Sequence, residues 1–330
     1  MGFFCVKLIM RYKMKKTLLI FVLISVLSFL FLQSCQKNEK KTVSHEKLKV
    51  VTTLFPLYDF AKNIGQDKVE VSLLLPPGVE AHTFEPRPAD IIRVQNSDLF
   101  IFTGKSMEPW VPNLLKGIDI NKLTVVDTSK NINLIYGNHT DKESEPSHKH
   151  QAESPDPHIW LDFPNATKMV DTIAAAFITR DPRNKDYYAG NSDDFKKKLE
   201  DLDKRYKDTL SKCRNKVIIH AGHFAFGYLA KRYSLKYISA YKGFTPDAEP
   251  TPKGLAELTS TIKKYGVNYI FYEELITPKV AEVISKETDC GLLMLHGAHN
   301  ITREEMNRGV EFISLMENNL KNLKVGLQCP

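Results

Sequence analysis

Short apolar runs recur along this chain and alternate with amphipathic stretches. The runs predict β-strands at residues 48–53, 69–75, 98–103 and 123–126, and again at 216–220, 236–240, 267–272 and 291–295. Helical periodicity fills most of the gaps, at 57–64, 88–95, 107–115, 223–231, 252–265, 278–287 and 303–323. Regular alternation of strand and helix predicts an α/β fold with parallel sheets.

The middle of the chain is helical without strands. One helix is predicted at 165–178 and a longer one at 186–211, whose apolar stripe is spaced by four, three, four and four residues: Phe195, Leu199, Leu202, Tyr206 and Leu210. A helix of about 26 residues is roughly 39 Å long. It could connect two domains as a rigid rod, or pack inside the core of one domain with the same stripe.

Two segments have no apolar period. Residues 36–46 are polar and suit a flexible tether. Residues 136–157 are acidic and rich in hydroxyl groups, and they hold His139, His148 and His150. The histidines favour an auxiliary metal-capture loop, and a plain solvated loop is the alternative.

The N-terminus has the pattern of an export signal. Basic residues precede an apolar run at 18–32, which is too short for a comfortable membrane span and is followed by Gln33-Ser34-Cys35. The end of this run resembles the bacterial lipobox, which implies that Cys35 is lipidated and becomes the first mature residue. An ordinary cleaved signal or a retained anchor is the alternative, and Met14 rivals Met1 as the start.

The net charge and the cysteines of the chain limit the possible binding partners and disulfides. Residues 1–34 carry five basic residues and no acidic one, so their removal lowers the formal charge from +7 to +2. No basic face interleaved with aromatic residues remains to suggest nucleic-acid binding. Beyond Cys35 the chain holds Cys213, Cys290 and Cys329, and a Cys213–Cys290 disulfide is one hypothesis.

Four histidines lie near the end of an apolar run or the start of a helical one: His82, His158, His223 and His299. Parallel α/β sheets place ligand-contacting groups on loops at such positions. Histidines far apart in sequence can therefore assemble a zinc site, unlike the closely spaced pairs of a zinc finger.

At these residues the chain closely resembles the solute-binding lipoproteins of bacterial ABC importers for zinc and manganese. The resemblance covers nearly all of the mature chain and rests on several motifs in order: VVTTLFPLYDFAKNIG, LLLPPGVEAHTFEPRPADI, DPHIWLDFPNA, HFAFGYLAKRY, DAEPTPKGL and IFYEE. It implies two lobes, each with a parallel sheet flanked by helices, joined by one long rigid helix. The implied metal site lies between the lobes.

The motifs carry over four ligands. His82 and His158 come from the first lobe, and the family's His/Glu-x-Ala-Phe pattern selects His223 over His220. The fourth register, where relatives usually have Asp or Glu, falls on His299. His296 is a rival, and Glu273 or Glu274 could replace either histidine.

Four imidazoles favour Zn²⁺ over Mn²⁺, which prefers more numerous oxygen ligands. The resemblance then implies a zinc receptor, not an enzyme, with an ABC permease and its ATPase as partners. It would act as a monomer, lipid-anchored on the outer face of the cell membrane or the periplasmic side in a two-membrane bacterium. Alternatives are a manganese or iron receptor, a surface adhesin with a structural metal, and a zinc hydrolase, although HExxH and G-x-S-x-G motifs are absent from the sequence.

The expected organisation follows from these assignments. A signal peptide is expected at residues 1–34 and a tether at 35–46. The first lobe, which contains the 137–157 loop, is expected at 47–164, a connecting helical segment at 165–212 and the second lobe at 213–330.

Overall fold

The computed structural model describes residues 46–136, 155–241, 243–244, 252–275 and 279–330. The predicted signal peptide, Cys35 and the three loop histidines His139, His148 and His150 therefore lie outside the described residues. No helix within the described ranges is long and apolar enough to cross a membrane. Residues Lys47–Pro330 form one compact unit, which holds all the elements of the fold.

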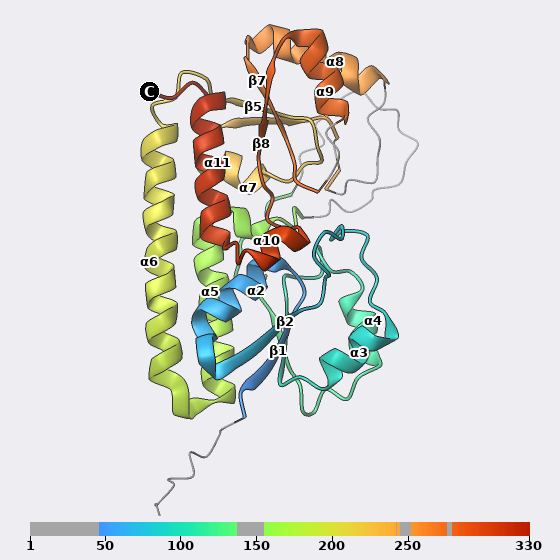
Figure 1. Cartoon of the computed structure of the whole chain (residues 1–330), viewed down its shortest axis with the longest axis vertical. Helices are drawn as coiled ribbons and strands as arrows, with labels where there is room; N and C mark the ends of the chain where they lie inside the picture. The colour runs from blue at the N-terminus through green and yellow to red at the C-terminus, as the bar shows by residue number, and fades with distance from the viewer. Residues whose placement is uncertain (1–45, 137–154, 242, 245–251, 276–278) are drawn as a thin grey trace, which may run out of the picture. The chain divides into compact units, whose positions relative to one another are not determined.

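Two parallel four-stranded sheets form the framework (Figure 1). The first has the order β2-β1-β3-β4, with strands β1 (Leu48–Thr52), β2 (Val69–Leu73), β3 (Leu99–Phe102) and β4 (Thr124–Asp127). The second has the order β6-β5-β7-β8, with strands β5 (Val217–His220), β6 (Lys236–Ser239), β7 (Tyr269–Tyr272) and β8 (Gly291–Met294). The second order repeats the first, and the predicted α/β fold with two sheets is confirmed.

Each sheet is covered by helices on both faces, because side chains alternate along its strands. In β1, Val50 belongs to the large core cluster and the next residue, Val51, to the cluster on the other face. The first sheet carries α2 (Phe55–Gly65), α3 (Pro88–Gln95) and α4 (Val111–Lys116). The second carries α7 (Gly227–Arg232), α8 (Pro252–Tyr265), α9 (Lys279–Thr288) and α11 (Phe312–Gly326), and the short helix α10 (Arg303–Asn307) precedes α11. We call these sheets with their helices the first and the second lobe.

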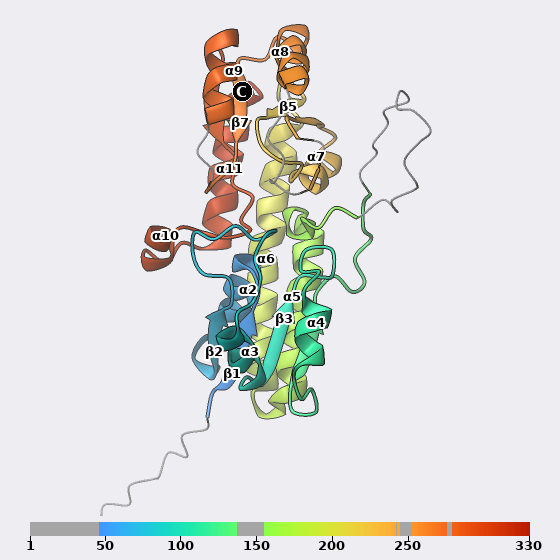
Figure 2. The same cartoon turned by 90° about the vertical axis from the view of Figure 1, so that its right-hand side faces the viewer.

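The long predicted helix is α6 (Lys185–Leu210), which follows α5 (Phe163–Arg180). All five residues of its apolar stripe are buried. Near its start, the Asn191 side chain donates a hydrogen bond to the carbonyl of Ile64 in α2, and near its end the Tyr206 hydroxyl donates one to the carbonyl of Met316 in α11. Helix α6 thus packs against both lobes (Figure 2), so it serves as connector and as core helix together.

The helix predicted at 303–323 is two helices, which is a correction. Gly309 has a φ of +66° and interrupts the helical path between α10 and α11. A new N-terminus follows, where Glu311 and Ser314 form a capping box. Helices predicted to begin at 107 and 223 also begin later, at Val111 and Gly227.

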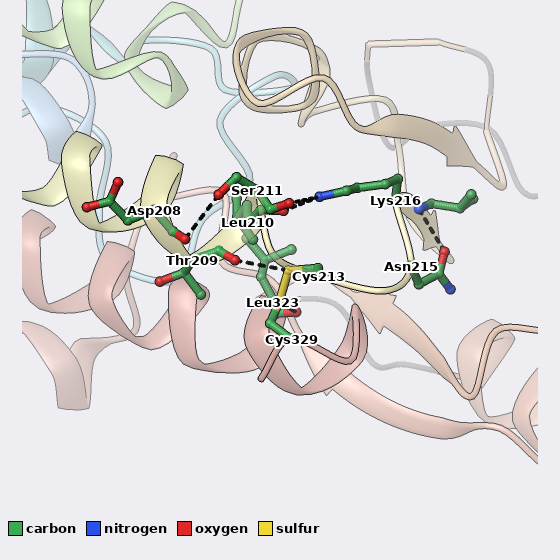
Figure 3. The surroundings of a disulfide bond; sticks show 10 residues. Asp208, Thr209, Leu210, Ser211, Cys213, Asn215, Lys216, Leu323 and Cys329 are labelled. Atoms are coloured by element: carbon green, nitrogen blue, oxygen red, sulfur yellow. Dashed lines mark hydrogen bonds between the residues drawn. A yellow bond between two sulfur atoms is a disulfide. The ribbon is translucent and has the colours of Figure 1, made fainter.

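The hypothesis of a Cys213–Cys290 disulfide is contradicted by the structure. Cys213 is bonded to Cys329, so the bridge joins the chain just after α6 to the chain just after α11 (Figure 3). Cys290 is a buried free thiol. It packs with Ile219 on the face of the second sheet opposite the cluster that contains Cys213, and this separation explains why the two cysteines do not pair.

Candidate metal centre

The four predicted histidines come from four different loops and meet at one point. His82 follows β2, His158 follows β4, His223 follows β5 and His299 follows β8, each beyond the carboxyl end of its strand. One nitrogen from each ring lies within 4.8 Å of the nitrogens of the other three. The structure therefore brings together all four residues of the predicted site.

The two nitrogen spacings around His158 suit a tetrahedral ion. Nε2 of His158 lies 3.4 Å from Nε2 of His82 and 3.3 Å from Nε2 of His223. Four nitrogens bound tetrahedrally at the usual zinc distance of about 2.0–2.1 Å stand about 3.3–3.4 Å apart. The buried Nε2 of His299 has no hydrogen-bond partner among the described residues. Such a group needs a cation or a donor to offset the loss of water.

Three of the four rings are held from behind by a carboxylate. Nδ1 of His158 is 2.7 Å from Oδ1 of Asp156, and Nδ1 of His223 is hydrogen-bonded to Glu273. Nδ1 of His299 is 3.3 Å from Oε1 of Glu274. When Nδ1 carries the proton and donates it to a carboxylate, Nε2 keeps a free lone pair that can bind a metal. The same hydrogen bond fixes the orientation of the ring. The three lone pairs then face the centre that a metal would occupy.

These carboxylates correct one sequence hypothesis. Glu273 and Glu274 directly follow β7, and they lie behind His223 and His299 where they do not replace a histidine at the centre. His296 is not part of the cluster, although its Nδ1 is 3.4 Å from Glu274. His220 ends β5, as expected of a neighbour of the site.

Asp156 was missed by the sequence reasoning. The signal was available in DPH, because an aspartate two residues before a histidine can accept hydrogen bonds from both its backbone and its ring. It does so here, with the His158 backbone N–H 3.0 Å from Oδ1.

Burial controls the charges at the centre. It lowers the pKa of His82 and of His158 well below the ordinary value, and neighbouring histidines lower each pKa further, so both rings are neutral near pH 7. Burial raises the pKa of Asp156 to about 8. Burial alone would lower the pKa of His299, but Glu274 outweighs it and the pKa is raised. The pKa shifts thus favour neutral rings at His82 and His158 and the protonated form of His299 beside Glu274.

The fourth loop requires a glycine. A Cβ on Gly297 would collide with the His299 ring and come within 3.3 Å of Glu274 Oε1. The backbone of Gly297 donates a hydrogen bond of 2.7 Å to the other oxygen of the same carboxylate. The glycine in the sequence HGAHN therefore allows the backbone, the His299 ring and the Glu274 carboxylate to approach one another closely.

Comparison with known proteins identifies the family. The model of the family described as zinc-uptake complex component A, periplasmic, matches residues 50–326. The chain belongs to this family. The high-affinity zinc uptake system protein ZnuA of Bacillus subtilis is 38% identical over 303 residues, which are 91% of this chain and 94% of that protein.

Family members from streptococci are also similar. The zinc-binding protein AdcA of Streptococcus pyogenes is 35% identical over 321 residues, and the match covers 94% of this chain but 61% of AdcA. The crystal structure of the Zn(II)-bound ZnuA-like domain of Streptococcus pneumoniae AdcA superposes with a TM-score of 0.73 at 34% identity, covering 86% of this chain and 99% of that one. The family assignment made from the sequence motifs is confirmed.

Proposed function

We propose that this chain is an extracytoplasmic receptor that captures Zn²⁺ between its two lobes and delivers it to an ABC permease. The observation that carries the proposal is the convergence of His82, His158, His223 and His299, whose ligand nitrogens all lie within 4.8 Å of one another. Nε2 of His158 is 3.4 Å from Nε2 of His82 and 3.3 Å from Nε2 of His223. Two ligands come from each lobe, so the ion joins the lobes. Family membership supports the role in zinc uptake.

The donor set favours zinc over manganese. Imidazole nitrogen suits Zn²⁺ in tetrahedral geometry, whereas Mn²⁺ prefers carboxylate, carbonyl and water oxygens. The carboxylates of Glu273 and Glu274 are turned to the far nitrogens of the rings and offer no oxygen to the centre. The Irving–Williams order means that Cu²⁺ binds such a site at least as tightly, so metal affinity alone does not identify the cargo.

A hydrolytic role fits the centre less well. A catalytic zinc keeps one position open for water beside three protein ligands. Here four histidine nitrogens converge on the centre, which is enough to fill a tetrahedral zinc, and within the described part of the chain no carboxylate joins them as a general base would. The chain's own work is therefore binding, with no bond made or broken.

The attachment and the partners belong to the same proposal. We infer that Cys35 carries the lipid that holds the receptor at the membrane, that residues 35–46 form the tether, and that the receptor acts as a monomer. His139, His148 and His150 would capture zinc weakly and pass it to the centre. Release needs the permease, because four coordinated nitrogens and their surrounding carboxylates hold the ion firmly.

The test is metal analysis of protein purified from its native membrane, combined with two single variants. We expect one zinc per chain in the wild type and a large loss of zinc affinity in His299→Ala. His296→Ala is the matched control, because His296 is buried in the same loop but lies outside the cluster. Unchanged zinc stoichiometry and affinity in His299→Ala would remove the fourth ligand, and bound manganese in place of zinc would overturn the choice of cargo.

A further inference from the structure

The loop that carries His299 belongs to the second lobe in sequence but is bonded to the first lobe in space. We call residues 297–301, which follow β8, the 297–301 loop. Five of its hydrogen bonds reach first-lobe groups: Trp160 Nε1 to Gly297 O at 2.7 Å, Phe55 N to His299 O at 3.3 Å, Gly78 N to Ile301 O at 2.8 Å, and Asn300 Nδ2 to Pro76 O at 2.7 Å and Val79 O at 2.9 Å.

Asn300 makes two of these bonds with one amide group. Its side chain is fully buried, and both hydrogens of Nδ2 point at carbonyls of the turn at residues 76–79. Its Oδ1 accepts a hydrogen bond of 2.9 Å from the backbone N–H of Ile301. Because two carbonyls face the side chain, the NH₂ group must be the one that meets them.

The turn held by Asn300 leads directly to His82. It begins just after the first-lobe sheet at Pro76 and ends three residues before that ligand. Gly78 in the same turn donates back to the carbonyl of Ile301. The loops of the first and the fourth ligand are therefore joined to each other near the metal centre.

The opposite end of the loop is fixed to the second lobe. Asn319 in α11 donates a hydrogen bond of 2.8 Å to His296 O and accepts one of 2.8 Å from His296 N. Gly297 N donates to Glu274. Asn319 is as buried as Asn300 and likewise holds the backbone of a loop through two short hydrogen bonds, but its partner lies within the same lobe.

We propose that Asn300 is a positioning residue that couples the His82 turn to the His299 loop and thereby limits the rate at which zinc leaves. The proposal rests on the proposed function. Separation of these two ligands must break the two bonds of the Asn300 amide and leave buried carbonyls without a donor, which is costly. The amide thus holds ligands from both lobes together, in addition to the bonds that the ligands make to the metal.

Zinc transfer from the loaded protein to an excess of a chromophoric chelator, followed by stopped flow, measures this rate. We expect Asn300→Ala to release zinc about tenfold faster or more, since it removes two buried hydrogen bonds. Asn319→Ala is the matched control and should lower the melting temperature of the metal-free protein to a similar extent with little change in the release rate. Equal release rates in Asn300→Ala and wild type, or equal acceleration in both variants, would overturn the proposal.

A second variant covers the case in which Asn300→Ala does not fold. Trp160→Phe keeps an aromatic ring in the core but removes the bond from Nε1 to Gly297 O, so it also weakens the attachment of the 297–301 loop. It should accelerate release, and a wild-type rate would count against the coupling. These outcomes can be distinguished from a failure of the proposed function. Wild-type protein that binds no zinc refutes the receptor, whereas a wild type that binds zinc, with variants that release it at the wild-type rate, refutes only the coupling.

Discussion

At the scale of single residues, the second nitrogen of each imidazole determines what the first can do. Burial alone would raise the pKa of Glu273, but its hydrogen bond with His223 and the nearby histidine charges outweigh burial and lower it. A charged carboxylate behind the ring makes the facing nitrogen a stronger base and a better metal ligand. We therefore expect the surrounding carboxylates to tune zinc affinity without contacting the ion.

Glu273→Gln tests this role. The amide oxygen can still accept the hydrogen bond from His223, so the ring keeps its orientation while the negative charge is lost. We expect zinc affinity to fall about 10-fold, at the lower end of the range for such partners, with one zinc still bound at saturation. Competition with a chelator of known affinity measures the change. Glu304→Gln, at an exposed position in α10, is the control, and equal affinities in the two variants would contradict the role.

The proton on His299 predicts how capture depends on pH. Because Glu274 raises the pKa of His299 above its ordinary value, this ring keeps its proton to higher pH than His82 or His158, whose pKa values are lowered. Zinc must displace that proton, so affinity should begin to weaken above the ordinary histidine pKa of about 6.5 and fall further as pH is lowered through it.

Calorimetry in buffers of different ionisation enthalpy counts the protons released on zinc binding. We expect the number to rise as pH is lowered from about 8 to about 6, since more of the His299 population is then protonated before binding. The Glu274→Gln variant should shift this rise to lower pH, because it removes the charge that holds the proton. A proton count independent of pH over this range would contradict the assignment.

Much of the site was accessible from the sequence at this scale. Each of the four candidate histidines follows a strand within a motif, so strand prediction and the family pattern selected four side chains that the structure brings together. The carboxylates that contact three of the histidine rings could not be predicted from the sequence in the same way. Whether Glu274 replaces His299 or supports it depends on a separation of a few ångströms between two loops, and Asn300 meets its partners 221 and 224 residues away. No local pattern records such contacts.

At the scale of elements, the hydrophobic periodicity predicted which helices and strands exist better than it predicted the residues at which they begin and end. Helices α3 and α8 have the predicted bounds, and the stripe on α6 is buried throughout. The single helix at 303–323 failed because its apolar positions continue across a break that depends on backbone conformation. Gly309 followed by Glu311 was the available signal, since glycine ends helices and a capping residue then starts the next one.

Two glycine substitutions should have opposite effects on stability. Gly309 has a positive φ, so Gly309→Ala should lower the free energy of unfolding by about 1 kcal/mol. Gly190 lies inside α6, and nothing would lie within 4 Å of an added Cβ. Gly190→Ala should therefore raise that free energy by about 0.5–1 kcal/mol. Denaturant unfolding of both variants measures the difference, and a shift of the same sign in both would be the wrong result.

At the scale of the whole molecule, the disulfide closes the second lobe. Cys213 and Cys329 are 116 residues apart in sequence, and a cross-link over about 100 residues removes about 4.7 kcal/mol of chain entropy from the unfolded state in the simplest model. We expect Cys329→Ala to lower the free energy of unfolding by about 2–5 kcal/mol. A reductant should do the same to the wild type but not to this variant. Equal sensitivity of the two proteins to reductant would contradict the bridge.

One continuous apolar core underlies both lobes, and it explains how the protein can release its cargo without unfolding. The large cluster extends from Val50 and Phe60 in the first lobe, through Phe195 and Tyr206 in α6, to Leu327 near the C-terminus. Burial of this extent stabilises the fold without a metal, unlike a zinc finger, whose folding free energy comes from the ion. The metal-free protein should therefore unfold cooperatively with a clear melting transition.

Added zinc should then raise the melting temperature in proportion to the logarithm of its free concentration. Stabilisation by a ligand that binds only the native state reaches about 2.7 kcal/mol at 100 times its Kd. Differential scanning calorimetry of chelator-treated protein, before and after zinc is restored, provides the measurement. His299→Ala should melt near the metal-free wild type but gain less from zinc. Loss of the transition on chelation would instead indicate a structural metal, as in an adhesin or scaffold, and would contradict reversible capture.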